Sequence, residues 1–394
     1  MGGAAALSAA APDATDAVDV AALTTLLKGQ AYGLGFDLAG IARLGPVETA
    51  GAFEAWVEAG YAGEMHYLGR GAEKRRDSRR PVEGAASAVV VAMSYGGREP
   101  SGPVARYARG DDYHDVMVEK LRALHAWLNE QLGRDVHGKA YVDTGPILER
   151  DLARRAGLGW FGKNTMLVNP ERGSFFFLGT LLVDLALQPD APFEHDRCGT
   201  CTRCLDACPT GAFTGPRQLD APRCISYLTI EQKGAIPEAL REAVGDRLYG
   251  CDVCQDVCPY NHKFGRPLSF DSPYAPRPAL AGRDARSLAR ELLAMSQPEF
   301  SAAFKGSPMK RAKLRGLKRN ASVVLGNVGS VDDVPVLAAA LSDEEPLVRA
   351  HAAWALGRVG SPAAAAALRA RLDAEVDAAV RAELESALDV FVVL

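Results

Sequence analysis

No cysteine lies outside residues 198–258 of this 394-residue chain, and no apolar run is long enough to span a bilayer. The longest apolar run, at 174–187, contains Asp184. The N-terminus lacks a basic segment followed by an apolar core, which excludes a secretory signal, and Ala6 stands where myristoylation needs Ser or Thr. We therefore expect a cytoplasmic protein without a membrane anchor. Its first 16 residues are predicted to be disordered, because they are Ala-rich and lack an amphipathic pattern.

A large excess of one charge sign is also missing. The net charge is -4, which excludes a general affinity for nucleic acid or anionic membrane, so any such binding must use a local patch. Apolar residues make up 48% of the chain, as in ordinary globular proteins, and the length allows two or three domains with substantial cores.

The eight cysteines form two runs with one cysteine between them. The first run, CGTCTRCLDACP, begins at Cys198 and has the spacing C-x2-C-x2-C-x3-C-P. The second, YGCDVCQDVCPYN, carries three cysteines at 251–258, and Cys224 stands between the runs. In a reducing compartment these thiols are not expected to form disulfides. The first run has the bacterial ferredoxin spacing for a [4Fe–4S] cluster.

In proteins with two such clusters, the fourth cysteine of a run ligates the other cluster. Applied here, this rule assigns every cysteine to one of two clusters: Cys198, Cys201, Cys204 and Cys258 to cluster one, and Cys208, Cys224, Cys251 and Cys254 to cluster two. Pairs of C-x2-C also suit structural zinc, which is the alternative. Zinc, however, has no use for the complete first run or for its repetition at 251–258. The pattern indicates electron transfer without naming the acceptor.

The segment before the cysteines mixes helix and strand signals. Apolar residues recur at helical spacing in 20–36 and 116–132, whereas 87–95 is β-branched and apolar like a buried strand. Residues 139–145 read as a strand running into a turn, and 174–185 as a further strand. We predict an α+β protein, with an N-terminal α/β domain at 17–190, a ferredoxin-like module at 191–265 and a linker with helices at 266–310.

The C-terminal segment, 311–394, contains an internal repeat. LGNVGS at 325–330 recurs as LGRVGS at 356–361, and LVRAHAAWALG at 347–357 is echoed by AVRAELESALD at 379–389. A period of about 31 residues with a glycine turn between helices predicts a short HEAT-like α-solenoid. Such arrays usually bind a partner; the alternative is a helical cap that only stabilises the core.

A basic run, KGSPMKRAKLRGLKR, leads into these repeats at 305–319 and holds no acidic residue. The next acidic residue is Asp332, so no ion-pair partner is near in sequence. A basic run is often just a solvated surface. On an acidic protein, a concentrated patch is also what local phosphate recognition requires, and EKRRDSRR at 73–80 could extend it. An aromatic signature of the RNA-recognition sheet type is absent, which argues against bases stacking on a sheet.

Several long motifs together resemble epoxyqueuosine reductases. They are the ferredoxin run, CISYLTIE after it, GLGWFGKNTMLVNPERGSFFFLG at 157–179, VDTGPILER at 142–150, YARGDDYHDVM at 107–117 and the terminal repeats. The resemblance covers residues 17–394 in order. It implies reduction of the epoxide of epoxyqueuosine, at the wobble position of certain tRNA anticodons, to queuosine. It also implies two [4Fe–4S] clusters and cobalamin, in a core similar to cobalamin-dependent reductive dehalogenases.

Removing the epoxide oxygen needs two electrons and a proton, and Asp143 occupies the family's proton-donor position in YVDTGPILER. A carboxyl in an apolar pocket would have a raised pKa and could act as an acid near neutrality. On the residues alone, a cap for the turn at Thr144–Gly145 is the simpler role, since Asp often plays it. Glu149 and Arg150 could pair with each other or with substrate.

No independent cobalamin motif is visible, because the D-x-H-x-x-G loop is not met: DYHDVM at 112–117 has Met where Gly is required. The resemblance implies that cobalamin binds without such a ligand, beside cluster two. It points to Ser226, Cys251 and Asp252, with His66, Lys163, Asn164 and Thr165 as further cofactor contacts.

For tRNA, the resemblance and the basic run suggest contacts from Gln232, Lys233, Lys310, Arg311, Lys313, Arg315, Lys318 and Arg319. The 17–190 domain would then be the cobalamin-binding catalytic domain and the repeats a tRNA-binding domain, in a monomer fed by an external electron donor. Two rival functions are a dehalogenase-like enzyme acting on a small molecule and a plain electron carrier. The first gains nothing from a basic helical tail, and the second does not need the N-terminal domain.

Overall fold

The structure, a computed structural model, describes residues 19–269 and 271–391. The segment predicted to be disordered, 1–16, lies outside these ranges. Within them, no helix is both long and apolar enough to cross a membrane.

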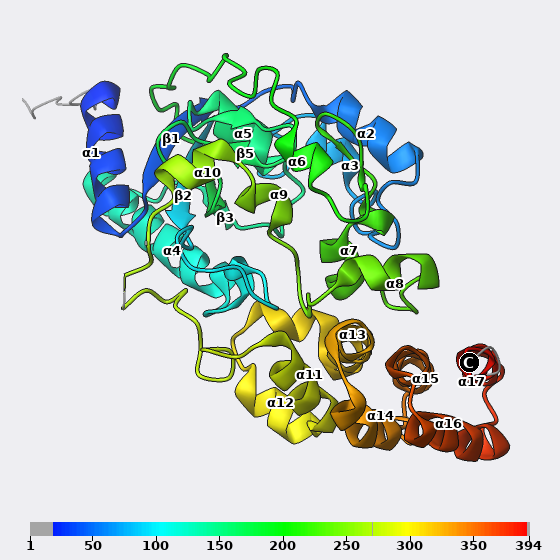
Figure 1. The fold of residues 1–394 in the computed structure, drawn as a ribbon. Helices are drawn as coiled ribbons and strands as arrows, with labels where there is room; N and C mark the ends of the chain where they lie inside the picture. The colour runs from blue at the N-terminus through cyan, green and yellow to red at the C-terminus, as the bar shows by residue number, and fades with distance from the viewer. Residues whose placement is uncertain (1–18, 270, 392–394) are drawn as a thin grey trace, which may run out of the picture.

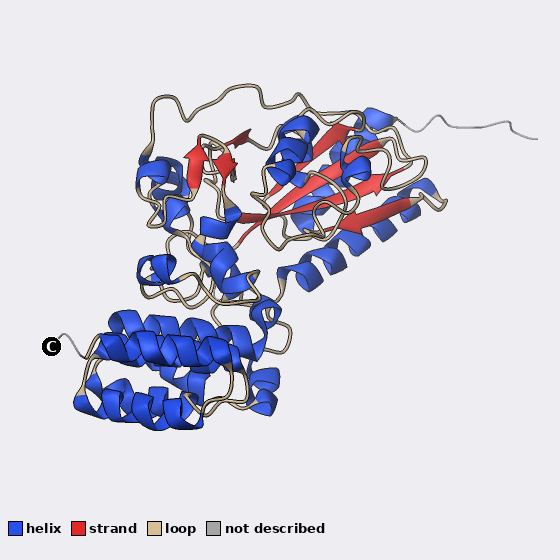
Figure 2. Cartoon of the chain, turned by 90° about the vertical axis from the view of Figure 1, so that its right-hand side faces the viewer, coloured by secondary structure: helices blue, strands red, loops and turns tan. Residues whose placement is uncertain are grey.

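The N-terminal domain is built on one four-stranded sheet with the order β1-β2-β6-β3, in which every neighbouring pair is antiparallel (Figures 1 and 2). Its elements are α1 (Val20–Gly33), β1 (Leu38–Arg43), α2 (Ala50–Glu58), α3 (Ala72–Arg75), β2 (Ser87–Ser94), the 3-10 helix η1 (Arg106–Ala108), α4 (Tyr113–Leu132), β3 (Gly138–Tyr141), α5 (Glu149–Arg155), the short pair β4 (Trp160–Phe161) and β5 (Leu167–Val168), and β6 (Phe176–Val183). The predicted helices and strands are confirmed in type, with ends that differ by a few residues.

Both faces of this sheet are buried, which explains the continuous apolar run of β2. Successive strand side chains point to opposite faces. Val89 and Val91 belong to a core with the apolar residues of α1 and α4, whereas Ala88 and Val90 belong to a second core with Leu152 of α5. The sheet is therefore a central layer, and the loop after β3 emerges at its edge.

The cysteine-bearing module consists of short elements linked by tight turns: α6 (Arg203–Asp206), β7 (Phe213–Gly215), β8 (Gln218–Leu219), η2 (Ala221–Arg223), α7 (Ile225–Ile230), α8 (Glu238–Val244), α9 (Val253–Asp256) and α10 (Pro259–Phe264). Cys258 is the N-cap of α10, and Pro259 takes its first helical position. Proline suits that position because its fixed φ matches the helix and its missing N–H would have no partner there.

The C-terminal part is a two-layered array of helices (Figure 1). It comprises α11 (Ala285–Ala294), α12 (Gln297–Ala303), η3 (Pro308–Ala312), α13 (Lys313–Val328), η4 (Val331–Asp333), α14 (Val334–Ala340), α15 (Pro346–Val359), α16 (Pro362–Ala374) and α17 (Ala378–Asp389). The repeated LGNVGS and LGRVGS segments mark the same point, the ends of α13 and α15. Helix α11, which falls in the segment predicted as linker and helices, packs against α13 and α14 and extends the array.

The row α13–α15–α17 faces the cysteine module. The backbone N–H of Ile236 donates to Nε2 of the fully buried His351 at 3.1 Å, and Arg241 pairs with Glu383 of α17 at 2.5 Å. These polar contacts and a shared apolar core join the array to the rest of the molecule.

Candidate active site beside two cysteine sets

The eight thiols gather into two sets. In the first, burial raises the pKa of Cys204 to about 11, and Cys198, Cys258 and Cys201 add to the rise. The pKa of Cys258 is likewise raised by burial, with Cys198 and Cys201 contributing. Thiols influence one another in this way only when they are close in space. The first set is therefore Cys198, Cys201, Cys204 and Cys258.

The second set follows the same pattern. Burial raises the pKa of Cys254 well above its usual range, and Cys224 and Cys251 add to the rise. Burial also raises the pKa of Cys224, with a smaller effect from Cys208. Cys204 of the first set acts on Cys254, so the two sets are neighbours. The ferredoxin cross-over divides the cysteines in the same way, and their assignment to two clusters stays a prediction.

The raised pKa values mean that these thiols favour their neutral form unless positive charge compensates the thiolates: Cys204, Cys224, Cys251, Cys254 and Cys258. In the described ranges, no three Cys, His, Asp or Glu side chains converge closely enough to hold a single metal ion. A cubane cluster differs from a single ion, since it takes each thiolate at a separate iron and its ligands stay apart.

Several N–H groups point at the sulfurs. The indole of Trp160 donates to Cys198 Sγ at 3.4 Å, and the backbone N–H of Ala212 donates to Cys208 Sγ at 3.3 Å. Hydrogen bonds of this kind tune the reduction potential of a cluster bound by such thiolates.

Lys163 and Asn164 donate hydrogen bonds to the backbone of the loops that carry the cysteines. Lys163 Nζ donates to the carbonyls of Gly199 at 2.7 Å and Cys201 at 2.9 Å. Asn164 is buried, and its amide donates to the Cys254 carbonyl at 3.2 Å. Both side chains thus hydrogen-bond within the protein, and the expectation that they contact a cofactor stays a prediction.

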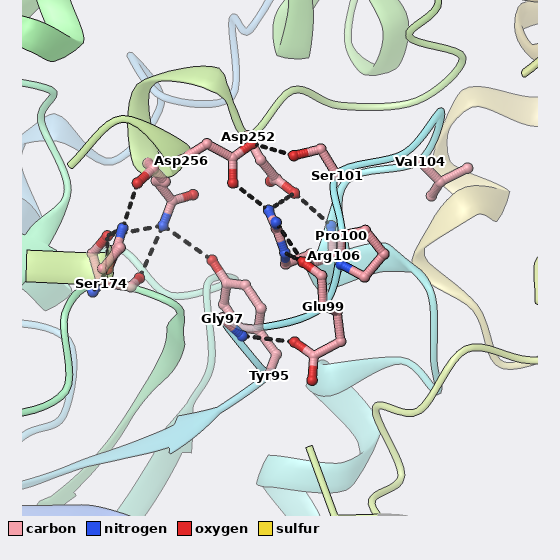
Figure 3. A network of polar contacts seen from close by, with 12 residues as sticks. Tyr95, Gly97, Glu99, Pro100, Ser101, Val104, Arg106, Ser174, Asp252 and Asp256 are labelled. Carbon is pink, nitrogen blue, oxygen red and sulfur yellow. Dashed lines mark hydrogen bonds and ion pairs between the residues drawn. The ribbon is translucent and has the colours of Figure 1, made fainter. Parts of the chain in front are cut away.

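A buried guanidinium joins the second cysteine run to the N-terminal domain (Figure 3). Arg106 Nη1 donates to Asp252 Oδ2 at 3.0 Å and to Asp256 Oδ1 at 2.7 Å, and its remaining N–H groups donate to the Glu99 carbonyl. Burial raises the pKa of Asp252, and the charge of Arg106 opposes the rise. The Asp252 carboxylate accepts hydrogen bonds from Arg106. A contact between Asp252 and a cofactor is therefore predicted to come from the backbone of Asp252.

A second polar group in Figure 3 lies beside the first. Gln255 donates to Tyr95 Oη at 3.3 Å and to the Ser174 carbonyl at 3.0 Å, while Asn261 donates to Ser174 Oγ at 2.9 Å. All four residues are buried. The turn from Cys251 to Cys258 is therefore fixed by hydrogen bonds on two sides.

Asp143 lies on the loop after β3 in a left-handed backbone conformation, with φ 58°. Its side chain is 67% exposed, and Oδ2 accepts a hydrogen bond from Tyr113 Oη at 2.7 Å. Its backbone N–H donates to Glu149 Oε1 at 2.7 Å. The turn at Thr144 is closed instead by Val142, whose carbonyl accepts from the Thr144 N–H. The carboxylate is thus held open to solvent by a tyrosine, away from the turn that it could have capped.

Glu149 is the half-buried partner of this arrangement. Burial and then the Asp143 carboxylate raise the pKa of Glu149 to about 8, against the opposing charges of Arg150 and Arg75. Burial and the same Asp143 raise the pKa of Tyr113. Arg150 donates to the Thr165 carbonyl, which leaves Glu149 to the Asp143 loop.

Aromatic side chains connect Asp143 to the second cysteine set. The rings of Tyr107 and Tyr113 meet edge to face with centroids 6.3 Å apart. A Cβ added at Gly250, where φ is 71°, would come within 3.4 Å of Tyr107 and 3.8 Å of Ser226 Oγ. Ser226 lies two residues after Cys224, and Gly250 immediately precedes Cys251. Together with Tyr107 and Tyr113, these residues form a surface between the second cysteine set and the Asp143 carboxylate.

His66 stands on the exposed loop between α2 and α3. This loop is fixed to α7, because Tyr227 Oη accepts from the Glu64 N–H at 2.8 Å and a Cβ at Gly63 would clash with the Tyr227 ring. The loop thus contacts α7, the helix that also carries Ser226. Thr165 has φ 68° and contributes its carbonyl to Arg150.

Several side chains of the basic run 305–319 form ion pairs with acidic residues. Arg311 pairs with Glu231 at 2.5 Å, Lys318 with Asp343 at 2.8 Å and Arg315 with Glu345 at 3.5 Å. No acidic residue is near in sequence, as expected, but the tertiary fold brings these partners from distant parts of the chain. Lys310 and Lys313 are exposed, and Gln232 donates to the Ala235 carbonyl at 3.4 Å.

Arg319 is not a surface residue at all. Its side chain is 1% exposed and donates to the carbonyls of Leu228 at 2.6 Å, Gln232 at 2.7 Å and Gly234 at 2.8 Å. The expectation that Arg319 contacts tRNA is therefore wrong, and Lys318, which is mostly buried against Asp343, is corrected with it. Arg319 instead holds the last turn of α7 and the residues after it in place. This segment, 228–234, is called the 228–234 loop below, and it carries Gln232 and Lys233.

The second basic cluster, 73–80, is similarly engaged. Arg75 is buried and donates to the Leu68 and Arg70 carbonyls, whereas Arg76, Arg79 and Arg80 pair with acidic neighbours. Lys74 in this cluster is exposed, and the extension of the basic surface by 73–80 stays a prediction.

Sequence reasoning missed Tyr113, Glu231 and Arg106 as site residues. Tyr113 and Arg106 lie within or beside the YARGDDYHDVM motif, so the motif marked the region without assigning their roles. Nothing in the TIEQKG segment pairs Glu231 with a residue that lies 80 positions further along the chain.

Replacing Arg319 tests its structural role. Arg319→Met should lower the free energy of unfolding by about 3 kcal/mol, because several buried carbonyls lose a charged donor worth roughly 1.5–3 kcal/mol each before relaxation. Chemical denaturation and hydrogen exchange of the 228–234 amides measure the loss. Lys305→Met, at an exposed position nearby, should change stability by less than about 0.5 kcal/mol. Equal stabilities of the two variants would contradict the assignment.

Comparison with known proteins agrees with these parts. The family described as "Epoxyqueuosine reductase QueG, DUF1730" matches residues 75–144, "4Fe-4S double cluster binding domain" matches 197–261 and "HEAT repeats" matches 312–389. The predicted α+β architecture, with a double-cluster domain and a HEAT-like tail, is confirmed.

Curated relatives named epoxyqueuosine reductase match over most of their length. The protein from Pseudomonas aeruginosa is 41% identical, covering 87% of this chain and 96% of that protein, and the one from Escherichia coli is 37% identical, covering 87% and 91%.

Two solved structures are also similar. Epoxyqueuosine reductase with an epoxyqueuosine-modified tRNA-Tyr stem loop has TM-score 0.86 and 34% identity, covering 94% of this chain and 99% of that chain. The Bacillus subtilis enzyme, with its aspartate catalytic loop swung out of the active site, has TM-score 0.85 and 33% identity, covering 94% and 100%. The chain thus belongs to the epoxyqueuosine reductase family and is an oxidoreductase.

Proposed function

We propose that this protein reduces epoxyqueuosine at the wobble position of tRNA anticodons to queuosine. The observation that carries the proposal is Asp143, a carboxylate held open to solvent by Tyr113 and Glu149 beside the second cysteine set. A relative was solved with an epoxyqueuosine-modified stem loop, and another with an aspartate catalytic loop, which supports the same role here.

The proposed cluster ligands are the two thiol sets. Cluster one takes Cys198, Cys201, Cys204 and Cys258, and cluster two takes Cys208, Cys224, Cys251 and Cys254. The mutual repulsion of each set supports this assignment, because four thiolates need the positive charge of iron to stay ionised together. An external donor would supply the electrons one at a time.

The residues between Asp143 and cluster two fit cobalamin. Tyrosine rings line this surface, Gly250 packs closely against Ala105, and Ser226 and the backbone at Cys251–Asp252 border it, with His66 on the adjoining loop. Such residues would hold a flat macrocycle by packing and hydrogen bonds, without a histidine ligand. When bound, cobalamin supplies strongly reducing low-valent cobalt.

Residues of this chain are proposed to supply the proton that the reaction needs. Asp143 is proposed to donate it to the departing epoxide oxygen, so that the C–O bond breaks without releasing an unprotonated alkoxide. The Tyr113 hydroxyl then stabilises the carboxylate that remains. Glu149 fixes the backbone of the loop, and its own proton keeps one neutral carboxyl in the Asp143–Glu149 pair.

For the tRNA, we propose contacts from Gln232, Lys233, Lys310, Arg311, Lys313 and Arg315. Lys233 lies near Arg311 and Lys313, and Asp143 is among the charges acting on Arg311, so these cations stand at the entrance to the site. The protein is proposed to act in the cytoplasm as a monomer.

The Asp143→Asn variant tests the proposed function. With cobalamin, reductant and an epoxyqueuosine stem loop, the wild type should form queuosine, detected by nucleoside mass spectrometry. The variant should retain iron and corrin but lose about 10²–10⁴-fold in turnover, since an amide cannot donate the proton. Near-normal turnover in a fully loaded variant would remove Asp143 from the mechanism, and no product from the loaded wild type would overturn the function itself.

Paired cysteine variants test the ligand assignment. Wild-type protein reconstituted without oxygen should contain about eight irons, the content of two [4Fe–4S] clusters. A Cys208→Ala and Cys254→Ala double variant should keep about four, because both changes affect one cluster. The matched Cys208→Ala and Cys201→Ala double variant should lose nearly all iron. Reversed iron contents would show that Cys208 ligates the cluster of its sequence neighbours.

The pH dependence tests the role of Glu149. Its pKa of about 8 implies that Glu149 keeps its proton up to about that pH. Turnover of the wild type should therefore persist to about pH 8 and then fall. Glu149→Gln removes this titrating proton, so the fall near pH 8 should be absent from the variant.

Stability provides a second readout for Glu149. Unfolded Glu releases its proton near its ordinary pKa of 4.5, whereas the folded residue keeps it to about 8. Relative to Glu149→Gln, the wild type should thus lose unfolding free energy as pH rises between these values. Identical alkaline limbs and parallel stability curves would contradict the proposal.

A further inference from the structure

Tyr67 is an aromatic residue left on the surface beside the candidate active site. It lies on the loop between α2 and α3, next to His66, and is 40% exposed. The guanidinium carbon of Arg311 lies 5.5 Å from the centre of its ring, within the range of a cation–π contact. The Tyr67–Arg311 pair thus brings together the α2–α3 loop and the start of the helical array.

Arg311 is held by a carboxylate along one edge, while its guanidinium lies over the Tyr67 ring. Nε donates to Glu231 Oε1 at 2.5 Å and Nη2 donates to Oε2 at 3.0 Å, a two-pronged contact along the edge of the guanidinium. The Arg311 side chain is still 51% exposed. Its charge is already compensated and its edge is occupied, so it is poorly suited to gripping a phosphate. A guanidinium in this state can still stack through its faces.

The pair lies near Asp143, the proposed proton donor. Burial raises the pKa of Tyr67, and the Glu231 and Asp143 carboxylates add to the rise. The carboxylate of Asp143 also contributes to raising the pKa of Arg311, after the larger effect of its hydrogen bond to Glu231. Asp143 is therefore near both members. Tyr227 fixes the loop of Tyr67, and Arg319 fixes the loop of Glu231.

We infer that the Tyr67–Arg311 pair is a stacking site for a single-stranded nucleobase, one that neighbours the modified nucleoside in the anticodon loop. This inference rests on the proposed function and deepens it. A nucleoside whose ring must reach Asp143 leaves the base stack, and its neighbours need a new surface to stack on. Aromatic rings and arginine planes serve as that surface in proteins that bind unpaired bases. Lys233 and Lys313, which lie near Arg311, are placed for the adjoining backbone.

The experiment uses the cluster-loaded enzyme and an epoxyqueuosine-containing anticodon stem loop as the probe. Tyr67→Ala should weaken binding roughly 5- to 150-fold, the usual effect of losing one base–aromatic stack. Tyr67→Phe keeps the ring and should bind within about threefold of the wild type. Tyr32→Ala is the matched control, because Tyr32 is 50% exposed on α1, which Figure 1 shows on the other side of the domain from α2 and α3.

A scan of the stem loop identifies the base. Removing one base at a time should reveal a position next to the modified nucleoside whose loss weakens binding to the wild type but not to Tyr67→Ala. The slope of log K against log[salt] should be unchanged by Tyr67→Ala, because no phosphate contact is lost, and shallower for Lys313→Gln. Strictly additive effects at every position would overturn the inference, as would equal affinities of Tyr67→Ala and the wild type.

The outcomes remain separate from those of the proposed function. If the wild type forms queuosine while Tyr67→Ala binds normally, the stacking site is wrong and the reductase proposal stands. If the loaded wild type forms no queuosine, the reductase proposal fails irrespective of Tyr67. Should Tyr67→Ala lose iron or unfold early, Tyr67→Leu, which keeps the apolar bulk without the ring, provides the same comparison with Tyr67→Phe.

Discussion

The buried guanidinium of Arg106 holds the cysteine module against the N-terminal domain. Its donors satisfy Asp252 and Asp256 on one side and the Glu99 carbonyl on the other, so the second cysteine run has one fixed position relative to the sheet. Removing one partner of a buried charge pair typically costs about 3–5 kcal/mol, because the remaining charge stays without compensation. The distance from the thiols to Asp143 depends on this contact, since Asp143 belongs to the sheet domain and the thiols do not.

The Asp143 loop illustrates a different balance. A non-glycine residue at φ 58° is strained by roughly 1–2 kcal/mol, and the hydrogen bonds from Tyr113 and to Glu149 offset that strain. The two terms are similar in size, so the loop is held without being locked. A relative described with its catalytic loop swung out shows that the corresponding segment of that enzyme has more than one position.

Local patterns in the sequence were enough to predict much of this molecule. The apolar run of β2, the helical spacing of α4, the repeats that end α13 and α15 and the cysteine runs are all set by neighbours in the chain. The errors concern charge. Arg311, Lys318 and Arg319 looked like one basic surface because their acidic or carbonyl partners come from Glu231, Asp343 and the 228–234 loop. Partners that distant in sequence follow from the tertiary fold, and no spacing rule could supply them. The same limit hid the contact between Tyr113 and Asp143.

Those corrections change how the helical tail contributes to function. A binding surface and a stabilising cap were alternatives on the sequence; the buried contacts of α13 support the cap, and the binding surface stays a prediction. The buried face of that helix carries Arg319, which shapes the loop of Gln232 and Lys233, and the exposed residues just before it include Lys310 and Arg311. Deleting the tail would therefore remove the basic residues and also release the 228–234 loop, which continues from the helix bearing Ser226. Loss of activity in a truncated chain could not separate binding from support. Single substitutions on the exposed face of this region, with Arg319 intact, can separate them, because the exposed side chains do not hold the loop.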